Sequence, residues 1–407
     1  MPELFLTIFF ISILLIFLGT GIWVSLSMVG VSAIGMFLFT SRPVGDAMAT
    51  TIWGTSSSWT LTALPLFVWM GEILFRTKLS ENLFKGLAPW MSRLPGGLIH
   101  VNVVGCALFA AISGSSAATV ATVGKMSIPE LRKRNYPEKL LLGSLAGSGT
   151  LGLLIPPSII LIIYGVTVQE SIAKLFIAGI IPGIMIAIFF MFYVIGWSMM
   201  NKNSMPKIDE TFSLSQKIKQ SGQLIPVIVL IAAVIGSIYV GIATATEAAS
   251  LGVVGALILS FFQKSLTKET FKLSLLGATK TSCMIAFILA GSAFLSLAMG
   301  FTGLPRNLAI WINEMKLSPY VLIMVLTLFY IILGMFLDGI SAVVLTMAII
   351  EPMIRQAGFD MIWFGVFLVI VVEMAQITPP VGFNLFVLQG MANKDMGFIA
   401  KSAFPLF

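Results

Sequence analysis

Two stretches of the chain combine consecutive prolines with small and hydroxyl-bearing residues. The first runs from Gly149 to Ser158 and contains Pro156-Pro157; the second runs from Glu373 to Gly382 and contains Pro379-Pro380. A proline pair removes two amide donors from a helix and clashes with carbonyls of the preceding turn. Both stretches therefore predict broken helices, whose freed carbonyl oxygens need other partners.

Each predicted broken helix follows two short apolar arms that flank a small polar centre. These centres are Ser113-Gly114-Ser115-Ser116 and Asp338-Gly339-Ile340-Ser341. The pattern predicts a helical hairpin at about residues 96–125 and another at about 319–352. The hydroxyl and carbonyl oxygens at such tips are suitable ligands for a hard cation, and sodium binds them without a full countercharge.

We therefore predict one sodium site where each hairpin tip faces a broken helix. The first would use Ser113, Ser115, Ser116 and Thr119 with carbonyls near Gly149 and Gly152. The second would use Thr378 with carbonyls near Asp338, Gly339 and Pro379. Proline kinks packed by neighbouring helices, and small residues that only allow close helix packing, are the structural alternatives. Two proline pairs at matching positions favour the ion sites.

The helices that begin after Gly114 and Gly339 would point free amides and positive dipole ends toward the same region. Such helix ends bind anions, so a carboxylate is the expected solute. The candidate substrate contacts are Gly114, Pro156, Pro157, Ser158, Pro380, Gly382 and Asn384.

Four acidic residues lie within or beside apolar segments, and acids in that position are functional candidates. They are Glu72, Glu247, Asp338 and Glu373. Asp338 is the strongest candidate of the four because it lies at a hairpin tip.

The composition excludes a soluble globular protein. Of the 407 residues, 58% are hydrophobic and 10% are charged, and the mean hydropathy is +1.02. Apolar runs long enough to cross roughly 30 Å of hydrocarbon recur along the chain, and spans in lipid must be helical or form a closed barrel. The helical spans that we predict are 4–18, 22–40, 60–76, 140–165, 172–199, 225–243, 246–262, 281–301 and 362–388.

The net charge of +7 is distributed in short clusters between apolar runs, which excludes a nucleic-acid partner and indicates membrane topology. Cys106 and Cys283 lie in apolar segments, so neither a disulfide framework nor a cysteine metal site is expected. Nothing in the sequence requires an organic cofactor.

The chain divides into two halves of similar order. Residues 1–200 hold the first hairpin and a broken helix at about 140–165, residues 201–224 form a polar cytoplasmic linker, and residues 225–407 hold the second hairpin and a broken helix at about 362–388. Basic residues flank both ends of the first hairpin, which places those ends in the cytoplasm, whereas the second hairpin would enter from the periplasm. The predicted fold is an all-α polytopic membrane protein with an inverted repeat, two re-entrant hairpins and two broken helices.

Several motifs resemble the large permease subunit (M, or DctM type) of TRAP (tripartite ATP-independent periplasmic) transporters. They are Leu64–Phe67 with Gly71-Glu72, Leu108–Thr119, Ile155–Ser158, Leu333–Asp338 and Glu373–Val387. The resemblance implies an elevator transporter of the bacterial inner membrane, and not an enzyme. In such a transporter a domain of hairpins and broken helices moves against a scaffold.

The resemblance also implies a ligand set and partners. Two sodium ions would bind, one at Ser113, Ser115, Ser116, Thr119 and Gly152, and the other at Gly339, Ser341 and Thr378. The implied partners are a small four-helix membrane subunit (Q type) and a periplasmic substrate-binding protein (P type). Members of the family normally continue beyond the position of Phe407 through a final apolar span.

Two other functions are consistent with parts of the pattern. One is a stand-alone ion-coupled symporter or antiporter of a related fold. The other is an intramembrane serine hydrolase, but Ser115 has no base beside it, because His100 lies about four helical turns away. The sequence leaves a C4-dicarboxylate, a sialic or other sugar acid and a keto acid open as solutes.

Overall fold

The computed structural model describes residues 2–77, 79–206, 212–222, 224–303, 305, 307, 310 and 318–407, and these residues form helices and no strands. The α-helices of the first half are α1 (Pro2–Gly19), α2 (Val24–Phe39), α3 (Val44–Ser56), α4 (Ala63–Phe75), α5 (Leu79–Met91), α6 (His100–Ser113), α7 (Ser116–Lys133), α8 (Glu138–Gly149), α9 (Leu151–Leu154), α10 (Ile159–Thr167) and α11 (Ile172–Met200). Those that follow are α12 (Leu214–Ser221), α13 (Ile225–Tyr239), α14 (Ala245–Phe262), α15 (Lys268–Thr302), α17 (Pro319–Gly334), α18 (Gly339–Gln356), α19 (Met361–Ala375), α20 (Phe383–Ala392) and α21 (Met396–Ala403). Four short 3₁₀ turns accompany them: η1 (Trp59–Thr62), η2 (Gly97–Ile99), η3 (Lys202–Ser204) and η4 (Phe404–Leu406).

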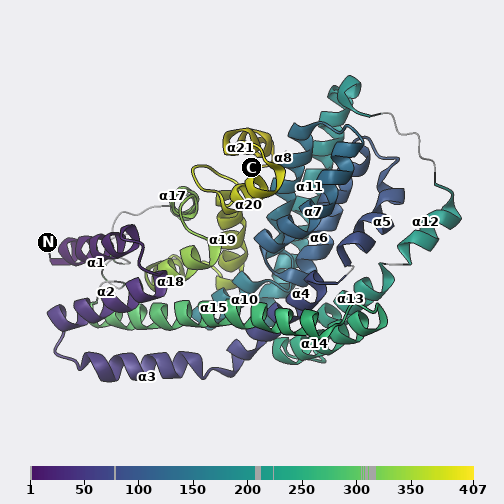
Figure 1. The fold of residues 1–407 in the computed structure, drawn as a ribbon. Helices are drawn as coiled ribbons and strands as arrows, with labels where there is room; N and C mark the ends of the chain where they lie inside the picture. The colour runs from purple at the N-terminus through teal and green to yellow at the C-terminus, as the bar shows by residue number, and fades with distance from the viewer. Residues whose placement is uncertain are drawn as a thin grey trace.

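The long helix α15 forms the base of the molecule in Figure 1. It packs against α2, α3 and α4 along its length, and α4 also packs against α14. Because α4 contacts α6 and α10 as well, it joins this base to the rest of the protein. We call α2, α3, α4, α13, α14 and α15 the base.

Helices α5 to α11 and α17 to α21 form a body above the base, while α1 packs against α2 and α12 packs against α5 (Figure 1). Helices α6 and α7 pack against each other and against α8, while α17 and α18 pack against α19. Contacts between α10 and α18, and between α7 and α20, connect the first half to the second. The two hairpins and the two interrupted helices therefore share one interior.

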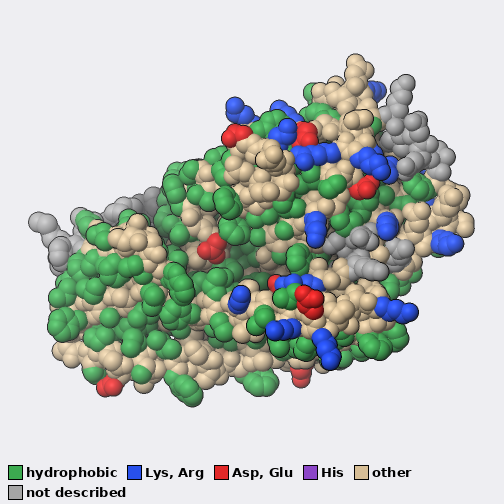
Figure 2. Space-filling view, in the orientation of Figure 1, with side chains coloured by type: hydrophobic (Ala, Val, Ile, Leu, Met, Phe, Trp, Pro, Cys, Tyr) green, Lys and Arg blue, Asp and Glu red, His purple; other side chains and the backbone are tan. Residues whose placement is uncertain are grey.

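The surface of the protein is rich in apolar side chains. Phe37, Ile181 and Phe192 are each well exposed, and Figure 2 shows hydrophobic side chains over most of the left part of the molecule while Lys and Arg lie mainly toward the right. Four described helices are long and apolar enough to cross a membrane, or seven if each of three bent helix pairs counts as one span. A surface of this kind suits lipid as its solvent.

The helix pattern differs from the sequence expectation in two places. Helix α15 begins at Lys268 rather than near residue 281, because its first turns carry lysines that a search for apolar runs excludes. Helices α3 and α5 had no predicted counterpart. Their sequences are only moderately apolar, and α3 buries no residue.

Candidate functional site

The tip of the first hairpin is built from a glycine turn and a serine cap. Helix α6 ends at Ser113, and Gly114 takes the left-handed conformation, with φ of +58°, that suits glycine. The Ser115 hydroxyl then accepts a hydrogen bond from the amide of Ala118, at 3.4 Å, and caps α7. The chain thus reverses within two residues.

Oxygen atoms gather immediately behind this tip. The hydroxyls of Ser113 and Thr119 lie 2.9 Å apart, and the Thr119 hydroxyl donates to the carbonyl of Ser115 at 2.8 Å. The side chain of Thr119 is fully buried and that of Ser113 nearly so. A Cβ atom on Gly152 would lie 2.6 Å from the Ser115 carbonyl oxygen. The broken helix therefore approaches this oxygen cluster as closely as only glycine permits.

The first helix interruption lies against the same tip. Helix α9 ends at Leu154, α10 begins at Ile159, and the two parts are bent by 40°. Ser158 caps α10 and its hydroxyl also donates to the carbonyl of Leu153. The amide of Ile159 donates to the carbonyl of Gly114 at 3.3 Å. One backbone hydrogen bond thus fastens the hairpin tip to the break.

The second hairpin repeats this arrangement with different residues. Asp338 caps α18 by accepting from the amide of Ser341 at 3.1 Å. Helix α19 ends at Ala375 and α20 begins at Phe383. Across this interruption, the amide of Val381 donates to the carbonyl of Met335 in the hairpin tip, at 3.3 Å.

Both hairpin tips open into one cavity of about 510 Å³. From the first tip Ser113, Ser115 and Ser116 line it, and from the second Asp338 and Gly339 do. Helices α7 and α18, of 18 residues each, begin at this cavity, so their first amides and positive dipole ends face it. Small polar or anionic molecules are the ligands that such a cavity can hold.

Hydrogen bonds join residues of the first predicted ion site, whereas the described residues show no such contact between Thr378 and the second hairpin tip. Thr378, in the interruption, donates to the carbonyl of Met374 in the preceding helix α19, at 2.9 Å, and no hydrogen bond among the described residues joins it to the second hairpin. Pro379 and Pro380 are exposed, whereas Pro156 and Pro157 are buried. Asn384, expected near the substrate, lies instead with its amide nitrogen 3.7 Å from the Cβ position of Gly149.

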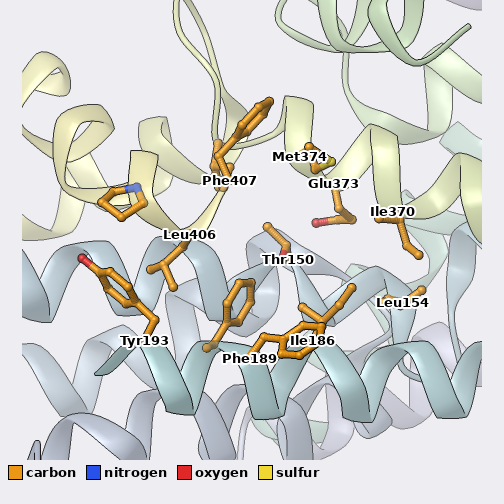
Figure 3. Close-up of a pocket in the computed structure, with 13 residues that line it drawn as sticks. Thr150, Leu154, Ile186, Phe189, Tyr193, Ile370, Glu373, Met374, Leu406 and Phe407 are labelled. Atoms are coloured by element: carbon orange, nitrogen blue, oxygen red, sulfur yellow. The ribbon is translucent and has the colours of Figure 1, made fainter. Parts of the chain in front are cut away.

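Three polar residues near these elements had no assigned role. Gln376 and Glu72 line the shared cavity, and Glu72 forms an ion pair with Arg76 at 3.0 Å. Glu373 is 3% exposed and faces a second cavity of about 340 Å³, where its carboxyl group points toward Thr150 (Figure 3). Their acidic or amide side chains within apolar segments were the only signal in the sequence.

The other candidate acids lie in ordinary environments. Asp338, the strongest candidate by sequence, is partly exposed and acts as a helix cap. Glu247 is exposed and completes a capping box with Thr244. Glu373 is thus the acid that the fold buries most deeply among these four.

Comparison with known proteins agrees with this architecture. Residues 9–407 match the family model described as the DctM component of the tripartite ATP-independent periplasmic transporter. The chain belongs to the DctM family. The C4-dicarboxylate TRAP transporter large permease protein DctM of Pseudomonas aeruginosa is 31% identical to it, with 92% of this chain and 87% of that protein covered.

Other relatives of this DctM protein carry different solute names. The 2,3-diketo-L-gulonate TRAP transporter large permease protein of Escherichia coli is 31% identical, with 88% of this chain and 84% of that protein covered. The isethionate TRAP transporter permease protein DctMQ of Oleidesulfovibrio alaskensis is 30% identical over 96% of this chain and 61% of its own length. The chain is accordingly a multi-pass membrane protein with a role in TRAP transport, and its relatives are permeases rather than enzymes.

Two solved transporters share the fold of this DctM chain. The YdaH transporter of Alcanivorax borkumensis superposes with a TM-score of 0.65 at 12% identity, over 100% of this chain and 94% of that one. The MtrF protein of Neisseria gonorrhoeae gives a TM-score of 0.51 at 12% identity, over 89% and 83% of the chains. At this identity the likeness concerns the fold alone.

Proposed function

We propose that this DctM permease is the large membrane subunit of a sodium-coupled, binding-protein-dependent uptake system for a carboxylate-bearing solute. The observation that carries the proposal is the cavity of about 510 Å³ into which both hairpin tips open. It combines two helix N-termini, which favour an anion, with serine and backbone oxygens, which favour a cation. A site of this composition can bind an anion and a cation together.

The oxygen cluster behind the first tip supports sodium as the coupling ion. Ser113, Thr119 and the Ser115 carbonyl already lie within 3.3 Å of one another in pairs, and they are largely removed from water. Hydroxyl and carbonyl oxygens at this spacing are typical ligands of hard cations. A second sodium ion at Gly339, Ser341 and Thr378 would require the Thr378 hydroxyl to give up its hydrogen bond to the carbonyl of Met374.

The names of the relatives support an organic anion as the solute. They specify C4-dicarboxylate and 2,3-diketo-L-gulonate, which are carboxylates, and isethionate, which is a sulfonate, so each is an organic anion. In the shared cavity a carboxylate would lie at the first turns of α7 and α18. Sialic acid, other sugar acids and keto acids fit the same requirement.

An elevator movement of the body against the base would carry this cavity across the bilayer. Two cross-half contacts support a body that moves as one unit: Arg132 donates to the carbonyl of Ala392 at 2.8 Å, and Arg355 to that of Val168 at 3.0 Å. The base meets the body through small residues. Gly71 of α4 faces the backbone of Ile112, where a Cβ atom would lie 3.1 Å from the carbonyl oxygen.

This arrangement also supports an inverted repeat. Arg132 lies at the end of the first hairpin and contacts the end of α20, whereas Arg355 lies at the end of the second hairpin and contacts the end of α10. Each hairpin therefore ends beside the broken helix of the opposite half. Two hairpins inserted from opposite membrane faces would produce this exchange.

A small four-helix membrane subunit and a periplasmic binding protein would complete the system in the bacterial inner membrane. The relative named DctMQ supports the first partner, because this chain spans only 61% of its length. The large apolar surface over α1, α2 and α3 offers an interface for such a subunit or for lipid (Figure 2).

The test is uptake of a radiolabelled acid into vesicles that contain this permease, its small subunit and its binding protein. We expect uptake to require an inward sodium gradient and to stop when potassium replaces sodium. Equal uptake in potassium would reject sodium coupling. Uptake that persists without the binding protein would instead indicate a stand-alone symporter or antiporter.

The hydrolase reading has no support in the site. Ser115 lies at the tip as a helix cap, whereas His100 begins α6 and its Nε2 atom lies 2.8 Å from the carbonyl of Pro95. Helix α6 spans fourteen residues, from His100 to Ser113, and its length separates the imidazole from the hairpin tip. Labelling of Ser115 by a serine-reactive probe would be evidence for the hydrolase hypothesis.

A further inference from the structure

Glu373 is a buried carboxyl group without a cationic partner among the described residues. It belongs to α19 of the second half, it is 3% exposed, and neither carboxyl oxygen forms a hydrogen bond of normal geometry among the described residues. An isolated carboxylate in a low-dielectric interior is costly, and such groups are normally paired with a cation or a hydrogen-bond donor. The described residues supply no Lys, Arg or His pair for it.

The hydroxyl-bearing neighbours Ser116 and Thr150 of Glu373 belong to the first half of the chain. The Ser116 hydroxyl faces its carboxyl group, and Thr150 lines the same cavity on the side toward which the carboxyl points (Figure 3). The Thr150 hydroxyl donates its proton to the carbonyl of Gly147 at 2.6 Å. It therefore presents lone pairs rather than a proton to its other neighbours, and it cannot neutralise Glu373.

A second unpartnered side chain lies at the same junction. Asn384 is fully buried, both polar atoms of its amide lack hydrogen bonds, and its nitrogen lies 3.7 Å from the Cβ position of Gly149. Ser116 in turn borders the oxygen cluster, because its Cα atom and the Thr119 hydroxyl both lie 2.7 Å from the Cβ position of Gly152. Glu373 thus reaches the border of the oxygen cluster through Ser116, and Asn384 lies against Gly149 of the same half.

We propose that Glu373 supplies the negative charge for a monovalent cation bound at the tip of the first hairpin. The inference rests on the proposed sodium coupling and adds a residue that couples the two halves. The hydroxyl and carbonyl oxygens of Ser113, Ser115 and Thr119 provide uncharged ligands, and the carboxylate of Glu373 compensates the ion across Ser116. The cation in return gives the buried carboxylate the partner that the protein does not provide.

The test measures sodium binding by the purified permease without transport. Thermal unfolding midpoints are recorded over a sodium chloride series, with choline chloride holding the ionic strength constant. A bound ion stabilises the folded state by RT ln(1 + [Na⁺]/Kd), so the wild-type midpoint is expected to rise once sodium exceeds Kd, and a fit of this rise gives the half-saturating sodium concentration. Glu373→Gln keeps the shape but removes the charge, and we expect the half-saturating sodium concentration to rise at least about tenfold.

Glu247→Gln is the matched control. Its carboxylate caps α14 at an exposed position in the base, and glutamine also fits a capping box. We expect it to keep the half-saturating concentration of wild type. If Glu373→Gln does not fold, Glu373→Asp retains the charge one methylene further away and is expected to raise the concentration several-fold.

The outcomes separate this inference from the proposed function. A wild-type half-saturating sodium concentration in Glu373→Gln would overturn the role of Glu373 while leaving sodium coupling intact. If Glu373→Gln does not fold, the same result in Glu373→Asp has this meaning. A wild-type protein whose midpoint rises equally in sodium and in choline would instead contradict sodium binding itself.

Discussion

The two helix interruptions use similar local chemistry in different surroundings. At the first, Pro156, Pro157 and Ser158 are all buried; at the second, Pro379 and Pro380 are exposed. In both, one amide of the interrupted helix donates to a carbonyl of the neighbouring hairpin tip at 3.3 Å. The attachment of break to hairpin is therefore shared, and the burial of the prolines differs.

Helix α11 accounts for the burial of the first interruption. A Cβ atom on Gly179 would lie 3.0 Å from the carbonyl oxygen of Leu154, and one on Gly183 would lie 2.7 Å from the side chain of Ile155. Two glycines thus let α11 lie directly over the break. Because buried backbone carbonyls need partners, the first interruption is the one with the stronger requirement for an ion.

The hydroxyl groups follow the same division. The Thr119 hydroxyl forms hydrogen bonds with the Ser113 hydroxyl and the Ser115 carbonyl within the first hairpin. The Thr378 hydroxyl instead donates to the carbonyl of Met374 in the preceding helix α19. The comparison teaches that a matching sequence pattern does not produce two equivalent sites. At the first, the proposed ion ligands already contact one another; at the second, the Thr378 hydroxyl contacts Met374 rather than the hairpin tip.

The largest expected effect comes from Gly152→Ala. Its new Cβ atom would lie 2.6 Å from the Ser115 carbonyl oxygen and 2.7 Å from the Cα atom of Ser116, both backbone atoms that cannot easily yield. Overpacking of this kind costs about 1–3 kcal/mol. We expect the half-saturating sodium concentration for uptake to rise about tenfold or more. Kinetics of uptake against sodium concentration provide the measurement.

Gly390→Ala is the control for that substitution. It also lies within a helix of the body, and no heavy atom lies within 4 Å of its Cβ position. We expect wild-type sodium kinetics, with slightly higher stability from better helix propensity. Wild-type kinetics in both variants would show that the close approach of Gly152 does not define the ion site.

A smaller effect separates Thr119→Val from Thr378→Val. Valine keeps the shape of threonine and removes the hydroxyl oxygen. At Thr119 this deletes an oxygen of the assembled cluster, and we expect about a tenfold loss of sodium affinity, corresponding to about 1.4 kcal/mol. At Thr378 we expect sodium affinity to change by less than about threefold, because its hydroxyl donates to the carbonyl of Met374 in the preceding helix α19.

Sodium titrations monitored by thermal unfolding compare these two threonine variants directly. An equal loss in both would mean that the second site is already formed, and the contrast between the interruptions would then be wrong. A larger loss of sodium affinity in Thr378→Val than in Thr119→Val would mean that the second interruption, and not the first, holds the ion in this structure.

The local parts of this site were readable from the sequence. Proline pairs end helices for steric reasons, and glycine or aspartate at a turn starts the next helix, so the positions of the interruptions and of Gly114 and Asp338 follow from residue type. The oxygen-rich tip of the first hairpin followed from its run of serines. These are short-range effects that a single sequence contains.

The contacts between the halves were not readable. Asn384 follows the second interruption and was predicted as a substrate contact, but the sequence did not indicate that its side chain lies against Gly149 of the first half. Glu373 was one of four candidate acids in the sequence and ranked below Asp338, and only packing shows that it is buried against the first half. Long-range packing depends on how helices are arranged, and periodicity does not specify that arrangement.

The smallest expected effect concerns the two arginines that join the halves. Arg132 forms hydrogen bonds of 2.6 and 3.2 Å with the carboxylate of Glu138 and one of 2.8 Å with the carbonyl of Ala392. Arg355 bonds to Glu351 on its own helix at 2.9 Å and to the carbonyl of Val168 at 3.0 Å. The arginine side chain is 35% exposed in the first ion pair and 46% in the second, so solvent screens both.

We expect Arg132→Gln to lower the free energy of unfolding by about 1 kcal/mol and Arg355→Gln by about 0.5 kcal/mol or less. The two-point contact of Arg132 with Glu138 is the physical reason for the difference, because both of its bonds are lost together. Denaturation of the purified permease in detergent measures both values.

Because each arginine also binds the end of the opposite half's broken helix, the double variant should lose about the sum of the two effects if the contacts act independently. A loss well beyond that sum would show that the two ends of the body stabilise each other across the membrane, and would strengthen the view that the hairpins and broken helices move as one unit.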